Sequence, residues 1–214
     1  MASGTNEFER GSEWRQWDLH VHTPASFHWK GPKFDDDMTS DATRKVVDDM
    51  IAALNAATPA VFALMDYWTF DGWFALKQRL KEPGAPKLTK TVFPGIELRL
   101  MAPMPARLNA HVLFSDQIDD QVLKDFKAGL QVEVVHRPLS DASLVQLGRT
   151  ASEDKLTIHG FKKANVDADE KVALRAGSTI AEINCDSYRN AIAKVPSGHA
   201  IGFMPWDTSD GLAE

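Results

Sequence analysis

The stretch Asp18-Leu19-His20-Val21-His22-Thr23 decides how this chain is interpreted. It closes a segment, residues 14–23, in which polar and apolar side chains alternate, and this pattern predicts a β-strand that runs into a loop. Residues two apart in a strand share a face, so His20 and His22 are expected to point the same way. Two imidazoles on one face make half of a metal site. A chain with seven histidines can also show such a pair by chance.

Three further ionisable residues lie in or at the end of apolar strands that follow. They are Asp66, Glu97 and His111. A charge buried in such a strand is costly unless it is paired or bound to a metal. Because ligands gather at the carboxyl ends of strands in α/β folds, four successive strands would bring these groups and the two histidines to one rim.

Each of these three residues also has an ordinary structural interpretation. Asp66 would cap the next turn, and His111 would be buried and neutral. Glu97 would pair with Arg99 or Arg107. Taken singly, each of these interpretations is favoured. The order of the residues, together with the histidine pair, favours a metal centre.

The first two thirds of the chain alternates strand and helix, which predicts an α/β layer or barrel. Strands are expected at residues 60–65, 91–100 and 109–114, with short ones at 132–135 and 201–203. A helix capped by Ser40 or Asp41 is expected to bury one apolar face, formed by Val46, Val47, Met50, Ile51 and Leu54. Further helices are expected at residues 73–80 and 116–130, and most of the chain from there to about residue 193. Residues 1–13 are polar and are expected to form a flexible tail.

Composition removes several classes of protein. With 24 basic and 30 acidic residues among 214, the net charge is -6, which disfavours a generally cationic binder of nucleic acid or membranes. One cysteine, Cys185, can form neither an intrachain disulfide nor a thiolate cluster. The sequence shows no membrane-length apolar run and no secretory signal at its start, so we expect a cytoplasmic protein. Phosphate-loop, dinucleotide and serine-hydrolase motifs are missing, which leaves histidine and carboxylate chemistry.

Four short motifs resemble those of a known family. They are residues 18–26, the stretch Ala63-Leu64-Met65-Asp66-Tyr67, the stretch Gly95-Ile96-Glu97-Leu98, and His111-Val112-Leu113. In this order they resemble the first motifs of the polymerase-and-histidinol-phosphatase (PHP) superfamily. Its members are metal-dependent phosphoesterases on a distorted seven-stranded (β/α) barrel. The resemblance implies such a domain over residues 14–214, with the clear match over 14–114 and an incomplete barrel at the C-terminal end as one option.

A narrower resemblance concerns the second and third motifs. Residues 66–72, with Tyr67 after the aspartate, and residues 93–100 are similar to the N-terminal PHP domain of TrlF-like proteins. That branch joins the PHP domain to a AAA-like or SMC-like ATPase, and some members are associated with phage defence. The resemblance implies that these 214 residues are the N-terminal piece of a larger protein with an ATPase module.

The resemblance also assigns roles to residues. It implies that His20, His22, Glu97 and His111 bind one or two divalent ions, Zn, Mn or Fe, with Asp66 as a further ligand or a partner that orients a histidine. Tyr67 stands where the superfamily has a histidine ligand, and a neutral phenol is a poor ligand. Either one metal position is lost, or the cation draws in the phenolate.

Other residues are expected to serve the substrate. Asp66 and Arg99 are the expected catalytic residues. Arg99, Arg107 and Tyr67 are expected to bind substrate, because a guanidinium can hold phosphate bidentately. Trp29, Trp68 and Trp73 could stack on bases, although aromatic residues at such spacing are more often core.

The later motifs of the superfamily are not evident. It has a later histidine ligand and a closing Asp-x-His pair, and no Asp-x-His follows His111. His136, His159, His199 and Asp207 are the candidates for these late ligands.

The expected function is hydrolysis of a phosphodiester or phosphomonoester, a nucleic acid included, by a metal-activated water. The alternative is a degenerate PHP-like scaffold that docks an ATPase module or nucleic acid.

Overall fold

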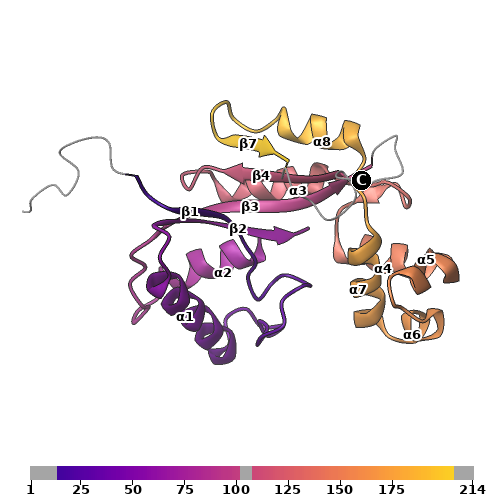
Figure 1. The fold of residues 1–214 in the computed structure, drawn as a ribbon, viewed down its shortest axis with the longest axis horizontal. Helices are drawn as coiled ribbons and strands as arrows, with labels where there is room; N and C mark the ends of the chain where they lie inside the picture. The colour runs from indigo at the N-terminus through magenta and orange to yellow at the C-terminus, as the bar shows by residue number, and fades with distance from the viewer. Residues whose placement is uncertain (1–13, 102–107, 205–214) are drawn as a thin grey trace, which may run out of the picture.

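The computed structural model describes residues 14–101 and 108–204, which form a mixed α/β fold around a central sheet (Figure 1). In chain order the elements are β1 (Trp17–Val21), α1 (Asp41–Ala56), β2 (Val61–Tyr67), α2 (Asp71–Arg79), β3 (Thr91–Leu100), β4 (Leu108–Phe114), α3 (Asp120–Gly129), β5 (Gln131–Val132), β6 (Arg137–Pro138), α4 (Asp141–Thr150), α5 (Glu153–Ile158), α6 (Lys163–Ala168), α7 (Glu170–Ile180), α8 (Cys185–Ile192) and β7 (Ala200–Phe203). The five strands of the sheet lie in the order β1-β2-β3-β4-β7, and β5 pairs with β6 apart from it.

The predicted α/β class is confirmed, with a sheet that is only partly parallel. β1, β2 and β3 run parallel, whereas β4 is antiparallel to both β3 and β7. Parallel neighbours need a crossover of roughly a dozen residues or more. Only residues 101–107 separate β3 from β4, so this connection returns the chain antiparallel. The expectation that four strands end at one rim is therefore wrong for β4.

The predicted barrel is not confirmed by this sheet. Within the described residues, β1 and β7 are its two edges and do not pair with each other. The strand predicted at residues 132–135 also differs from the structure, in which only Gln131–Val132 pairs as a strand. The chain turns immediately afterwards: the His136 N–H donates to the Val132 carbonyl, and His136 has a φ of 50°.

Helix α1 shows why the apolar periodicity predicted a covering helix. The Ser40 side chain accepts a hydrogen bond from the Thr43 N–H and begins the helix. Val47, Ile51 and Leu54 are buried in the same cluster as residues of β2. Figure 1 shows α1 and α2 along one side of the sheet. The opposite face of the sheet carries the candidate site.

Helices α4 to α7 form a group beyond the carboxyl ends of β2 and β3 (Figure 1). They share a small core of their own, made by Leu156, Val166, Ala173 and Ala176. Helices α4 and α7 touch backbone to backbone, because a Cβ on Gly177 would lie 1.8 Å from the Leu144 carbonyl oxygen. Among the described residues, no helix has the length and apolar character needed to span a membrane.

Candidate metal centre

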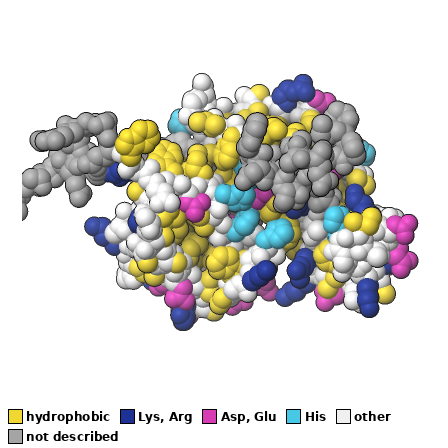
Figure 2. All heavy atoms as spheres, viewed as in Figure 1, with side chains coloured by type: hydrophobic (Ala, Val, Ile, Leu, Met, Phe, Trp, Pro, Cys, Tyr) yellow, Lys and Arg dark blue, Asp and Glu magenta, His cyan; other side chains and the backbone are white. Residues whose placement is uncertain are grey.

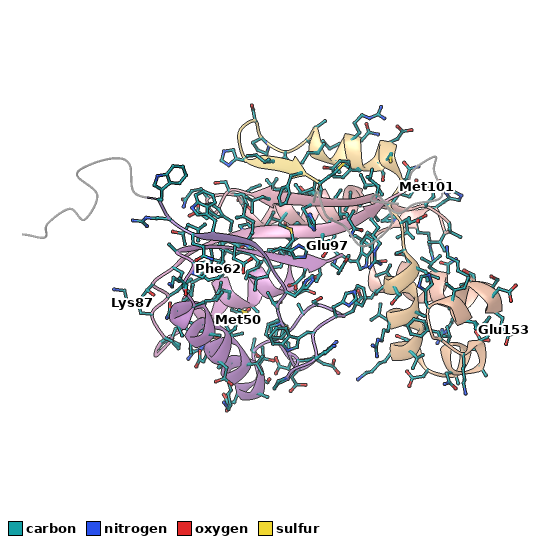
Figure 3. All side chains as sticks on the ribbon, in the orientation of Figure 1. Met50, Phe62, Lys87, Glu97, Met101 and Glu153 are labelled. Atoms are coloured by element: carbon teal, nitrogen blue, oxygen red, sulfur yellow. The ribbon has the colours of Figure 1, made fainter. Side chains whose placement is uncertain are left out.

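His20, His22 and Glu97 come together as a possible metal site. Each offers a ligand atom, and these atoms lie within 4.8 Å of one another. His20 Nε2 lies 3.1 Å and His22 Nε2 3.6 Å from the same carboxylate oxygen, Glu97 Oε2. Figure 3 labels Glu97 near the middle of the sheet, and Figure 2 shows histidine side chains gathered near the centre of one face. In the part of the chain that the structure describes, no other group of three such residues lies this close.

A bulge in β1 aims both histidines at this face. Asp18 pairs with Phe62 and Val21 with Leu64, so three residue steps on β1 lie opposite two on β2. The extra residue shifts the alternation of side chains, because a bulge places two residues opposite one. Val21 shares the α1 face with Leu64, and His20 and His22 therefore point to the other face.

The bulge is supported by a local hydrogen bond, in which the His20 N–H donates to Asp18 Oδ1 over 3.2 Å. The two imidazole rings lie 5.1 Å apart, edge to face. The predicted common face of His20 and His22 is confirmed.

Glu97 is the buried member of the site, with 2% of the residue exposed. Burial by itself raises the pKa of a carboxyl. Interactions with His111, His20 and Tyr67 outweigh this effect and lower the pKa of Glu97 to about 2. The hydrogen bond between His20 and Glu97 raises the pKa of His20, and this effect is larger than the opposing effect of burial. Glu97 is therefore a carboxylate at neutral pH.

His111 lies on β4, which pairs antiparallel with β3, and it is the register partner of Glu97. Its Nε2 lies 3.6 Å from Glu97 Oε1, and its ring centre lies 4.6 Å from that of His20. The residue is 1% exposed, and neither ring nitrogen has a hydrogen-bond partner among the residues that the structure describes. A buried imidazole without a partner is costly unless something else binds it.

These residues fit a divalent metal ion. Two imidazoles, a buried carboxylate and a further buried imidazole form the mixed nitrogen and oxygen donor set that suits Zn, Mn or Fe. Among the described residues, the ring nitrogens of His111 and the buried Nδ1 of His22 have no hydrogen-bond partner, and these observations favour the assignment.

Asp66 holds the loop that follows β1. Its Oδ1 accepts a hydrogen bond from the Thr23 N–H over 2.7 Å, and its Oδ2 accepts one from the Thr23 hydroxyl over 2.6 Å. The closest His22 nitrogen is 3.8 Å from Asp66 Oδ1. Gly72 packs against this pair so closely that a Cβ there would lie 2.1 Å from Thr23 Oγ1. Asp66 lies outside the three-residue group, and these contacts suit a residue that positions His22.

Arg99 lies beside Tyr67 and not against Glu97. Its guanidinium carbon is 4.5 Å from the centre of the Tyr67 ring, and its Nη1 donates to the carbonyls of Ser178 and Thr179. The residue is 4% exposed, and it makes no ion pair with Glu97 within the described residues. The last turn of α7 carries the negative end of the helix dipole, which suits a buried cation.

Tyr67 ends β2 next to Glu97 in register. Its ring stacks on that of His22 at 5.6 Å. Burial is the main cause that raises the pKa of the Tyr67 hydroxyl well above its usual value. The hydroxyl is therefore neutral, as expected for a poor metal ligand.

His28 is a neighbour of the site that the sequence did not single out. Its ring lies 5.2 Å from Tyr67 and 6.2 Å from His22. Burial, followed by the charge of Arg99, lowers the pKa of His28. In the structure, the Ser26 N–H donates to the Thr23 carbonyl, and this turn folds the chain back so that His28 lies beside the site.

Three of the late candidate ligands, His136, His159 and His199, are not part of the group. His136 lies in the turn between β5 and β6, and His159 ends α5. His199 precedes β7, at the opposite end of that strand from Phe203, which is the register partner of His111. Arg107 and Asp207 lie outside the described residues, so their expected roles remain predictions.

Three tryptophans were expected either in the core or stacked on bases, and the structure places them in two different settings. Trp68 and Trp73 are buried in the core, and the Trp68 Nε1–H donates to the Ser178 carbonyl. Trp29 is only half-buried and lines a cavity.

Known structures similar to this chain are distant from it in sequence. No family profile matches the sequence, and no curated protein matches it. An amidohydrolase from Chromobacterium violaceum, solved with sulfate and no metal, aligns with 76% of this chain and 47% of its own at 17% identity, with a TM-score of 0.39. A candidate metal-dependent phosphoesterase from Bifidobacterium adolescentis aligns with 88% of this chain and 65% of its own at 14% identity, with a TM-score of 0.37. The chain spans less than two thirds of either structure, and similarities this weak carry no argument about its activity.

Proposed function

We propose that this chain is a metal-dependent hydrolase that acts on phosphoesters. The observation that carries the proposal is the convergence of His20, His22 and buried Glu97, with ligand atoms within 4.8 Å of one another. The PHP-like motifs that contain these residues supply the substrate class.

The residues have distinct roles in this proposal. His20, His22, Glu97 and His111 would hold one or two divalent ions. When bound, such an ion polarises a phosphoryl oxygen and lowers the pKa of a water. Asp66 would keep the His22 loop in place through Thr23, and both of its oxygens serve that purpose.

Arg99, Tyr67 and Arg107 would bind the phosphoryl group. Arg99 is a buried cation whose Nε has no hydrogen-bond partner within the described part of the chain. A guanidinium held in this way keeps a donor for an anionic oxygen. Tyr67 lies between Arg99 and His22 and carries a neutral hydroxyl that can donate.

The wider setting in this proposal follows the TrlF-like motifs. They support a nucleic acid as the phosphodiester and an ATPase module in the full-length protein. The net charge of -6 limits contact with nucleic acid to a local region of the surface.

A second candidate is a scaffold without activity. Tyr67, in place of the superfamily's histidine, favours it, since its neutral phenol removes one ligand. Such a protein would dock an ATPase module or nucleic acid and would hold metal weakly or not at all.

Metal content and turnover of one set of variants separate the two candidates. The double variant His20→Ala/His22→Ala should lose bound metal and activity on bis(p-nitrophenyl) phosphate, with little change in its circular dichroism. His199→Ala is the matched control and should keep both, because it lies outside the group. A wild type that binds no Zn, Mn or Fe would favour the scaffold. Equal turnover by the wild type and the double variant would show that these histidines do not serve catalysis.

A further inference from the structure

A cavity of about 370 Å³ lies between α1 and the end of β1, and its lining includes His22 but not Glu97. It is formed by β1, the loop that follows β1, and the exposed flank of α1. Most of its wall is apolar, and Figure 3 labels two of the residues that line it, Phe62 on β2 and Met50 on α1. Apolar side chains adjoin the gathered histidines in Figure 2. A volume of this size is within the range of small-molecule sites.

The cavity explains a difference between the predicted and observed faces of α1. Val46 and Met50 were expected in the core with Val47, Ile51 and Leu54, yet both are only half-buried. Both line the cavity, as does Ala53 one turn further along. This part of the apolar face of α1 therefore borders open space within reach of His22.

One wall of the cavity is a fixed aromatic ring. The Trp29 Nε1–H donates to the Pro32 carbonyl over 2.9 Å. Gly31 packs against the same indole, because a Cβ at that position would lie 2.8 Å from Trp29 Nε1. Since the ring is held before any ligand arrives, little conformational freedom is lost when another flat group stacks on it.

The polar groups in the wall select against anions. Asp18 and Asp49 are the two carboxylates that line the cavity, and no lysine or arginine does so among the described residues. Carboxylates repel a phosphate and accept hydrogen bonds from amino or hydroxyl groups. The cavity therefore suits an uncharged ring that carries donors.

We infer that this cavity binds the aromatic group of an aromatic phosphoester, a nucleobase or an aryl ring, while the phosphoryl group lies on the Glu97 side of His22. His22 lines the cavity and belongs to the candidate metal centre, so it joins the two sites. The inference rests on the proposed function and specifies its substrate class.

The cavity is tested first without metal or turnover. With a chelator present to remove metal, adenosine serves as an uncharged aromatic probe. Its binding is measured by saturation-transfer NMR and calorimetry. Ala53→Trp fills the cavity from an exposed position of α1, and Ala52→Trp places the same ring on the neighbouring exposed position, which does not line it. We expect Ala53→Trp to weaken adenosine binding by about 10-fold or more, and Ala52→Trp to leave it unchanged.

Trp29→Leu provides a second test if Ala53→Trp does not fold, as judged by circular dichroism. It removes the stacking surface and should also weaken binding by about 10-fold. The inference is wrong if the wild type does not bind adenosine at concentrations on the order of 10 mM. It is also wrong if Ala53→Trp, or Trp29→Leu in its place, binds adenosine as well as Ala52→Trp does.

The link to the metal centre is tested with two inhibitors of equal charge. Phenylphosphonate should inhibit the metal-loaded enzyme about 10-fold more strongly than methylphosphonate, and Ala53→Trp should abolish that preference. Equal inhibition by both in the wild type would overturn the link. If adenosine binds while no metal is held, the proposed function fails and the cavity stands. If metal and turnover are present while adenosine does not bind, only the inference fails.

Discussion

Glu97 shows at the scale of one residue why this site needs a cation. Its carboxylate is buried among the rings of His20, His22 and His111, which approach it at 3.1 to 3.6 Å. A buried carboxylate is strongly unfavourable unless a positive charge or several donors compensate it. Without metal, a protonated imidazole can compensate the charge of the carboxylate. A bound metal ion would compensate it instead.

The pH dependence of stability in the metal-free protein follows from this pair. The pKa of His20 is raised from 6.5, so its contribution is complete below that pH and is lost as the pH rises through the raised value. The pKa of Glu97 is lowered from 4.5 to about 2, so its contribution is lost as the pH falls between these values.

We therefore expect the contribution of this pair to stability to be largest between pH 4.5 and 6.5. The melting temperature in chelator, measured from acid to alkaline pH, checks this, and His20→Gln should remove the decline on the alkaline side. An identical profile in His20→Gln would contradict it. Metal affinity should increase as the pH rises, since the imidazole must lose its proton to bind a metal ion.

Tyr67 allows a gain-of-ligand prediction. Tyr67→His places an imidazole at the register partner of Glu97 and beside His22, and we expect higher metal occupancy in elemental analysis. Tyr67→Phe is the control, since it removes the hydroxyl without adding a ligand, and it should leave occupancy unchanged. If both variants hold the same amount of metal as the wild type, this position does not face the bound ion.

The elements of the fold meet at close backbone contacts that their sequences do not reveal. The bulge in β1 rotates two histidines onto the Glu97 face. Helices α4 and α7 cross at Gly148 and Gly177, where a Cβ on Gly148 would lie 2.3 Å from the Ala173 carbonyl oxygen. Because Arg99 and Trp68 bind the carbonyls at the end of α7, this crossing also sets where the helical group meets the site.

Gly177→Ala tests that crossing. Alanine is a better helix former than glycine by about 1 kcal/mol. The new Cβ would lie 1.8 Å from a backbone oxygen, which cannot move without shifting the helix. Overpacking costs roughly 1–3 kcal/mol and more in severe cases, so we expect the free energy of unfolding to fall by about 2 kcal/mol in urea denaturation.

Gly129→Ala is the matched control for this substitution. Its Cβ would lie 3.2 Å from the Ala191 Cβ and 3.8 Å from the Ala191 Cα, and we expect a change within about 1 kcal/mol. Equal stability of Gly177→Ala and the wild type would show that α4 and α7 are free to separate.

At the scale of the whole molecule, the site lies where separate parts of the chain converge. The loop after β1, the strands β3 and β4, and the carboxyl end of α7 all border it. A ligand that binds these parts together stabilises the folded state relative to the unfolded chain.

We therefore expect added Zn or Mn to raise the melting temperature, with a stabilisation of about 2.7 kcal/mol at 100 times the dissociation constant. Elemental analysis should find fewer than three ions per chain, and EDTA should remove them readily because the ligand set leaves coordination positions open. The double variant His20→Ala/His22→Ala should show no metal-dependent shift. Three tightly held ions in the wild type would show that His136, His159, His199 or Asp207 completes the site.

The sequence by itself determined most of the secondary structure, the pairing of His20 with His22 on one face, and the choice of Glu97 as a candidate ligand. These features depend on side chains a few positions apart, which periodicity reports directly. It did not predict the bulge in β1, the antiparallel β4, the engagement of Arg99 by α7, or the cavity beside Trp29. Those depend on contacts between distant segments, such as the bond between His20 and Glu97 across 77 positions, and only packing of the whole chain decides them.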